Sequence, residues 1–194
     1  HRELHSVDRR QLHMCIIDSY CDATLTASGS TADGQTIFDA DNLPFAVMKV
    51  RPSVNSTGVP DTDHQFHVGF GTFDSTPQSG FPTDGIFFSN SSDSGGTTGT
   101  ANWYAVTRSS STTTQTACSV AISETQYALL AIKVLSNSIV EFYIDGNVSN
   151  GIQLQKCATH TTNIPTSVQV PLVKADYDAG SNASILDVDF YRVW

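Results

Sequence analysis

The sequence predicts an all-β fold, an antiparallel β-sandwich, and three observations lead to it. Ser and Thr are abundant while Glu occurs three times and Met twice, a composition that suits strands and loops better than helices. Segments rich in β-branched and aromatic residues recur at intervals of about ten to twenty residues. Clusters of Gly, Pro, Asn, Asp and Ser separate these segments, as is typical of sandwiches and barrels.

Each predicted strand is a run of β-branched, aromatic or alternating apolar residues bounded by turn formers. In chain order, the clear strands are 43–51, 65–73, 84–89, 102–108, 113–120, 127–135, 139–145, 168–174 and 185–194. Two weaker candidates are 23–27 and 35–38. Strands 127–135 and 139–145 are separated by three residues, so we expect them to form an antiparallel hairpin. Their core side chains are expected to be Ile132, Val134, Phe142 and Ile144.

The last strand shows the alternation most clearly. The apolar side chains there are expected to share the core face: Leu186, Val188, Phe190 and Trp194. The opposite, solvent face is expected to carry Asp187, Asp189 and Tyr191.

The chain has the size and composition of one globular domain, with 194 residues, 39% apolar and 15% charged. Residues 1–14 are polar, contain three arginines and lack apolar periodicity, so they are predicted to form an N-terminal arm. Residues 15–194 are then a single β-sandwich domain. Residues 90–100 contain no large apolar side chain and are predicted to be an exposed, mobile loop.

Charge and hydropathy exclude two classes of partner. The formal charge of −9 repels phosphate backbones, so nucleic acid is not an expected ligand. The longest apolar run, 127–132, is far shorter than the roughly 18 residues of a membrane-spanning helix, so no membrane span is predicted.

Cysteines and glycosylation triplets point to an extracellular protein. The four cysteines form an even set without the CxxC spacing of zinc or redox sites, and they allow three pairings: Cys15, Cys21, Cys118 and Cys157. Four N-x-Ser/Thr triplets in turn or loop sequence are candidate glycan sites, although they also read as ordinary polar turns: Asn55, Asn90, Asn147 and Asn182. Together these features favour a location outside the cell.

The middle and end of the chain carry a family resemblance. Residues 102–108 read NWYAVTR, a Thr-rich strand ends at Val120, and alternating apolar residues follow Tyr127. Residues 140–146 read VEFYIDG, and a Thr-rich stretch ending in Ile-Pro follows at 159–165. This order resembles concanavalin A-like lectin/glucanase sandwich domains, of the kind found in bacteriophage virion structural proteins. The resemblance covers about residues 44–194 and implies a jelly-roll sandwich.

Two features depart from this family pattern. An insert at 147–156 separates the VEFYIDG strand from the Thr-rich stretch, and the four cysteines are not part of the pattern. A bridge between Cys118 and Cys157 would pin the insert to the sheet, which would leave Cys15 and Cys21 as the second pair.

The acidic residues do not form the motif of a sugar-cleaving enzyme. Glycosidases need two carboxylates that flank the glycosidic bond, and the glucanases of this fold carry them as E-x-D-x-E on one strand. Here that motif is absent. Asp187 and Asp189 share a strand face, but Tyr191 stands where a third acid would be. The prediction is that the protein is not an enzyme.

Two groups of residues could hold a metal, and in both a structural interpretation is preferred. The cluster at 61–67 contains Asp61, Asp63, His64 and His67, but an extended strand turns the two histidines to opposite sides. Oxygen ligands for calcium exist in two places, at Asp39, Asp41 and Asn42 and again at Asp176, Tyr177 and Asp178. Neither set has the spacing of a calcium loop, so no cofactor is predicted.

The first functional hypothesis is a non-enzymatic structural subunit of an extracellular assembly. The assembly would be a virion surface, as a decoration or fibre module, or a secreted filament, and the partners would be copies of the chain or other structural subunits. The alternative is a carbohydrate-binding, lectin-like module in which Trp103 and Tyr104 contact a glycan. These two residues are adjacent in a strand and point oppositely, so at least one is expected in the core. A glycoside hydrolase is the third and least favoured reading.

Overall fold

The computed structural model describes residues 20–22, 43–54, 64–72, 80–167, 169–177 and 184–194. The predicted arm 1–14 and the two weaker strand candidates, 23–27 and 35–38, lie outside these ranges. Within them the regular secondary structure is β-strand, apart from one 3-10 turn, η2 (Val148–Asn150).

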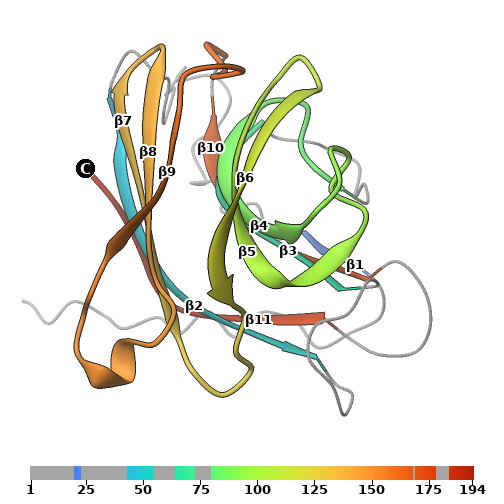
Figure 1. The fold of residues 1–194 in the computed structure, drawn as a ribbon. Coiled ribbons are helices and arrows are strands. Elements are labelled where there is room, and N and C mark those ends of the chain that lie inside the picture. The colour runs from blue at the N-terminus through green and yellow to red at the C-terminus, as the bar shows by residue number, and fades with distance from the viewer. Residues whose placement is uncertain (1–19, 23–42, 55–63, 73–79, 168, 178–183) are drawn as a thin grey trace, which may run out of the picture.

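The strands form two antiparallel sheets that pack face to face (Figure 1). One sheet has the order β1 (Tyr20–Asp22), β10 (Val170–Tyr177), β3 (His64–Gly71), β4 (Gly85–Ser91), β5 (Gly99–Ser109) and β6 (Thr112–Ala121). The other has the order β11 (Ser184–Val193), β2 (Phe45–Val54), β7 (Ala128–Ser136), β8 (Ile139–Asp145) and β9 (Gln155–His160). The predicted all-β antiparallel sandwich is therefore confirmed.

The core lies between the two sheets and follows the period-two alternation of the strands. The predicted hairpin of β7 and β8 is present, and Ile132 pairs with Phe142 at its centre. The four core side chains expected from this hairpin are all buried. Phe88 of the opposite sheet meets Phe142 edge to face at 5.4 Å between ring centroids, so aromatic contacts join the two layers.

A β-bulge in β11 overturns part of the predicted alternation. Val188 pairs with Val50, and Phe190 pairs with the neighbouring Lys49, so one extra residue of β11 lies between these pairs. The extra residue turns Tyr191 towards the core, where its hydroxyl donates to the carbonyl of Gly69. Trp194 is 66% exposed, and its ring stacks on Phe45. The predicted faces are correct for Leu186 and Val188. They are wrong for Phe190, which pairs with Lys49 and does not pack against the core, and for Tyr191 and Trp194.

The segment 90–100 was predicted to be an exposed, mobile loop, but hydrogen bonds and burial fix much of it. Its two ends belong to β4 and β5, and Asn90 and Ser91 are buried. The Asp93 carboxylate accepts hydrogen bonds from the backbone N–H of Thr98 at 2.7 Å and of Thr97 at 2.9 Å. Burial raises the pKa of Asp93, but hydrogen bonds from the Ser91 hydroxyl, the Thr98 and Gly95 N–H groups and the Thr97 hydroxyl outweigh it and lower the pKa overall.

Two strands were not anticipated, β1 and β9. Strand β9 begins inside the predicted insert 147–156 and extends into the Thr-rich stretch, where it completes the edge of the five-stranded sheet. Among the described residues, no helix is long and apolar enough to cross a membrane.

Candidate functional site

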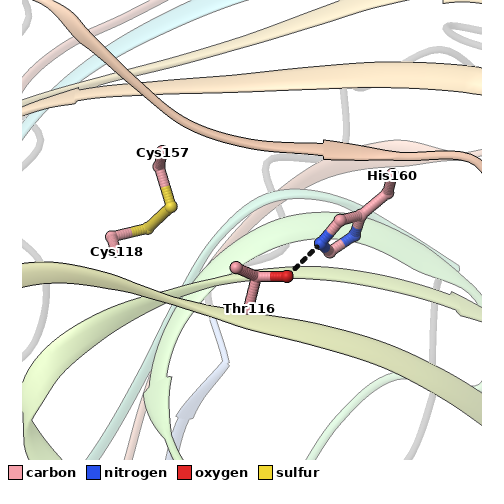
Figure 2. Close-up of a disulfide and its surroundings, with 4 residues drawn as sticks. All are labelled: Thr116, Cys118, Cys157 and His160. Atoms are coloured by element: carbon pink, nitrogen blue, oxygen red, sulfur yellow. Dashed lines mark hydrogen bonds between the residues drawn. A yellow bond between two sulfur atoms is a disulfide. The ribbon is translucent and has the colours of Figure 1, made fainter.

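Strands β6 and β9 are edge strands of different sheets, and they face each other across a seam (Figure 1). A disulfide between Cys118 of β6 and Cys157 of β9 bridges this seam, as Figure 2 shows. This pairing was suggested from the sequence, where the insert and the cysteines depart from the family pattern. Cys15, the partner expected for Cys21, lies outside the described residues.

On β6 the cysteine sits in an irregular stretch of the ladder. Tyr104 of β5 pairs with Ala117, whereas Asn102 pairs with Ala121. Between these two pairs β6 advances by four residues and β5 by only two. Ser119, within this stretch, has a φ of 55°, in the left-handed region. Because a bulge re-aims side chains, this irregularity allows Cys118 to reach across the seam.

Strand β9 has a matching irregularity. Tyr143 of β8 pairs with Lys156, and the preceding Phe142 pairs with Ala158, so Cys157 is the extra residue of a bulge. Both cysteines are therefore placed by interruptions of regular pairing, which period-two sequence reasoning does not reveal.

Polar contacts join the two edge strands on one side of the disulfide. The His160 ring accepts or donates at both nitrogens, with Nδ1 3.0 Å from Thr107 Oγ1 and Nε2 3.0 Å from Thr116 Oγ1 (Figure 2). Further along, the hydroxyls of Thr114 and Thr162 lie 2.7 Å apart. Burial lowers the pKa of His160 to about 4, so the ring is neutral at pH 7.

On the other side of the disulfide the seam opens into a cleft of about 450 Å³. One wall is the end of β6, which directly follows Cys118, and the other is the segment that leads into Cys157. The cleft is lined by Ser119, Val120, Ala121, Ile144, Asp145, Gly146, Asn147, Gly151, Gln153 and Gln155.

The Asp145 carboxylate shapes the wall formed by the insert. One oxygen, Oδ1, accepts from the backbone N–H of Asn147 at 3.0 Å, and Oδ2 accepts from that of Gln153 at 2.7 Å. Gly146 allows β6 to approach, because a Cβ at this position would lie 2.4 Å from Cγ1 of Val120. The predicted insert 147–156 therefore folds into a wall of the cleft.

The lining groups suit hydrogen bonding to a neutral polar ligand. Three side-chain amides, one hydroxyl and one carboxylate line the cleft, together with the apolar Val120 and Ile144. No Lys, Arg or His is among its lining residues.

Comparison with known proteins identifies the family. A family model described as "SO2946-like, C-terminal domain" matches residues 22–189. The chain belongs to this family. No curated protein matches the sequence.

Solved structures resemble this SO2946-like domain in fold. Protein SO2946 of unknown function from Shewanella oneidensis MR-1 is 11% identical, with a TM-score of 0.54, over 81% of this chain and 59% of that chain. This domain therefore spans little more than half of that protein. A legume lectin-like domain from Entamoeba histolytica is 12% identical, with a TM-score of 0.47, over 81% of this chain and 74% of that one. A SAP-like pentraxin from Limulus polyphemus is 11% identical, with a TM-score of 0.42, over 78% and 63%.

The structure corrects the predicted sugar contact at Trp103. Its side chain is fully buried in the core, because β5 turns it towards the other sheet. Tyr104 points to the opposite face, as expected, where it is half-buried against a smaller apolar cluster of Phe81, Phe87, Val106 and Leu172. Neither residue lines the cleft.

The candidate glycan sites fall in different environments. Asn90 is completely buried, and its Nδ2 donates to the carbonyls of His64 at 2.7 Å and Thr100 at 3.2 Å. A glycan does not fit there in the folded domain, which corrects that prediction. Asn147 is half-exposed at the cleft, where its Oδ1 accepts from Ser149 N–H. Asn55 and Asn182 lie outside the described residues.

The two aspartates of β11 are paired with cations on β2. Asp189 lies 2.7 Å from Lys49 Nζ, and Asp187 accepts from Nε of Arg51 at 3.1 Å. Hydrogen bonding to Asp187 raises the pKa of Arg51. These contacts place both carboxylates in ion pairs on the outer face of the five-stranded sheet.

The histidines of the candidate metal cluster are both buried in β3. His67 has its Nδ1 2.9 Å from Ser89 Oγ, and its ring meets Phe81 and Phe87 edge to face. Burial, followed by the charge of Lys174, lowers the pKa of His67 well below its ordinary value. Asp61 and Asp63 lie outside the described residues, as do Asp39, Asp41, Asn42 and Asp178. Asp176 and Tyr177 lie at the end of β10, and no group of three metal-ligating side chains occurs in the described part of the chain.

Sequence reasoning missed the cleft residues Ser119, Asp145, Gln153 and Gln155 as a group. They come from the end of β6 and from the region between β8 and β9, which meet at the seam that the disulfide bridges. The unusual insert was the available signal, since an insertion at a strand end commonly carries function.

Proposed function

We propose that this SO2946-like domain is a non-enzymatic carbohydrate-binding module. The observation that carries the proposal is the polar cleft between β6 and the β8–β9 connection. Its volume of about 450 Å³ lies within the range of about 300 to 1,000 Å³ that is typical of small-molecule sites. The ligand is a short saccharide or a chain end.

The lining chemistry matches a sugar. An amide side chain offers both donors and an acceptor, so Asn147, Gln153 and Gln155 can each serve a hydroxyl group. Val120, which is partly exposed, supplies an apolar surface for the C–H groups of a pyranose ring. The backbone bonds that hold Asp145 keep its wall in place before the ligand arrives, which limits the entropy cost of binding.

The charge of the site favours a neutral saccharide over an acidic one. The only ionisable side chain that lines the cleft is Asp145, and no cation offsets it there. The formal charge of −9 adds repulsion towards anionic polymers.

The proposal places the domain outside the cytosol. A disulfide between residues 39 positions apart supports an oxidising compartment. Glycan binding there is compatible with a role as a surface module of a virion or filament. That structural role stays a prediction, because its arm at 1–14 lies outside the described residues.

The test is a titration of the oxidised domain against neutral oligosaccharides of glucose, galactose, mannose and xylose, followed by calorimetry on the best ligand. Gln153→Ala and Gln155→Ala each remove an amide from the cleft. Together they should weaken binding about tenfold or more, the equivalent of one or two hydrogen bonds.

Asn137→Ala is the matched control, because it removes an amide from the tip of the β7–β8 hairpin, at the opposite end of β8 from Asp145. It should bind like the wild type. Absence of binding to every oligosaccharide, or equal affinity in the cleft variants, would rule the proposal out.

A further inference from the structure

We infer that the Cys118–Cys157 disulfide is a redox switch for the cleft. In the oxidised protein the disulfide holds the two walls of the cleft close enough for both to contact one saccharide. Reduced, it lets the walls separate and saccharide affinity falls. The loss of affinity rests on the proposed function, whereas the opening of the walls does not.

The disulfide is positioned to control both walls at once. Ser119 directly follows Cys118, and Gln155 lies two residues before Cys157, so each wall is continuous with one cysteine. The walls belong to different sheets, and β6 and β9 pair with β5 and β8, not with each other. No backbone ladder therefore holds one wall to the other.

The wall on β6 is also loosely held to its own sheet. In the pairing of β5 with β6, the register passes from Ala117 to Ala121 and skips the residues between them. This skipped stretch contains Cys118, Ser119 and Val120. Because paired backbone groups resist local opening of a strand, this stretch depends on the disulfide and on the packing of Cys118 and Val120 against the core.

The remaining contacts across the seam lie on the far side of the disulfide. They join Thr116 to His160 and Thr114 to Thr162, and Asn163 donates to Thr114 Oγ1 at 2.9 Å. These bonds keep the sheets together after reduction, so opening is confined to the cleft. On the cleft side, Val120 packs against Gly146 and against the core between the sheets.

The chemical step is an ordinary thiol–disulfide exchange. A dithiol reductant supplies two electrons and two protons, the S–S bond breaks, and both cysteines become thiols while the reductant becomes a disulfide. Cys118 and Cys157 are half-buried, so a small dithiol can reach the bond without global unfolding.

Hydrogen exchange of the full chain tests the opening directly. The amides of 119–121 and 153–157 should exchange at least about tenfold faster after dithiothreitol treatment, and likewise in the Cys118→Ser/Cys157→Ser variant. The amides of β7 and β8 exchange through global unfolding, so they lose only the stability that the disulfide gives the whole fold. They should stay better protected than the amides of the cleft. Thr114→Val is the control, because it removes the polar contact on the far side and leaves the disulfide intact.

Unchanged exchange at the cleft would overturn the inference. So would cleft amides that exchange no faster than those of β7 and β8 in the reduced protein, because the bond would then stabilise the whole fold without controlling a local opening. Oligosaccharide titration is read separately. If the oxidised protein binds, affinity should fall about tenfold or more on reduction, and equal affinity overturns the switch. If the oxidised protein does not bind, the proposed function fails and the exchange data alone decide the opening.

Discussion

At the residue scale, burial lowers the pKa of His160, an effect that the sequence around it does not predict. The ring lies between the sheets with both nitrogens at hydrogen-bonding distance from threonine hydroxyls. These hydroxyls satisfy a neutral ring, and a proton added there has little water to solvate it. The pKa therefore falls from the ordinary value of 6.5 to about 4.

This depressed pKa predicts a loss of stability in acid. Below pH 6.5 the unfolded chain binds a proton at His160, whereas the folded chain does so only near pH 4, so stability is lost as the pH falls through this window. The loss at about pH 4.5 should be about 2 to 3 kcal/mol. Urea unfolding near pH 7 and near pH 4.5 measures it.

His160→Gln is the comparison, since glutamine keeps donors and an acceptor but does not titrate. His67 and the carboxylates titrate in both proteins, so the difference between the two pH dependences isolates His160. Equal pH dependences would contradict the prediction.

The two tryptophans should differ strongly in their effect on stability. Trp103 is fully buried, and Trp103→Ala should cost about 3 to 5 kcal/mol because it leaves a large cavity. Trp194 is mostly exposed, and Trp194→Ala should cost less than about 1 kcal/mol. Urea unfolding followed by far-UV circular dichroism compares them, and similar losses would mean that one of these placements is wrong.

At the scale of elements, bulges decide where side chains go. The bulge in β11 moves Tyr191 into the core, and the irregular stretches of β6 and β9 aim two cysteines across the seam. An extra residue in one strand reverses the faces of everything beyond it, so a single insertion has a long reach.

The disulfide between these elements should be a major contributor to stability. It closes a loop of 39 residues, for which chain entropy predicts about 4 kcal/mol. The Cys118→Ser/Cys157→Ser variant should lose about this free energy of unfolding in urea. Thr114→Val, which removes the two seam hydrogen bonds to Thr162 and Asn163 and leaves the disulfide intact, should lose about 1 to 2 kcal/mol. A Cys118→Ser/Cys157→Ser variant as stable as the wild type would contradict the prediction. It would mean that losing the disulfide does not raise the conformational entropy of the unfolded chain.

At the scale of the whole molecule, the question is whether the sandwich assembles. If the arm 1–14 docks on neighbouring subunits, sedimentation of the full chain should show oligomers, and a chain of residues 15–194 should sediment as a folded monomer. Circular dichroism of the shortened chain checks that the sandwich is intact. A full chain that stays monomeric at high concentration argues against a structural subunit and leaves the carbohydrate-binding function unaffected.

Local pattern was enough to predict the architecture. The alternation in 127–145 predicted a hairpin with four core side chains, and all four are buried. The sequence also contained the insert at 147–156, which forms one wall of the cleft. Sequence failed for Asn90, whose polar triplet reads as an exposed turn although its amide is bonded in the interior.

The amino-acid sequence by itself determined the fold class, because strand periodicity is a property of neighbouring residues. Only the tertiary structure decided which tryptophan is buried, which face Tyr191 takes, and that Ser119, Asp145 and Gln153 line one cleft. These outcomes depend on which residue pairs with which across distant strands. A shift of one residue in that pairing moves the side chains of a strand to the other face of its sheet. The local sequence pattern does not reveal such a shift.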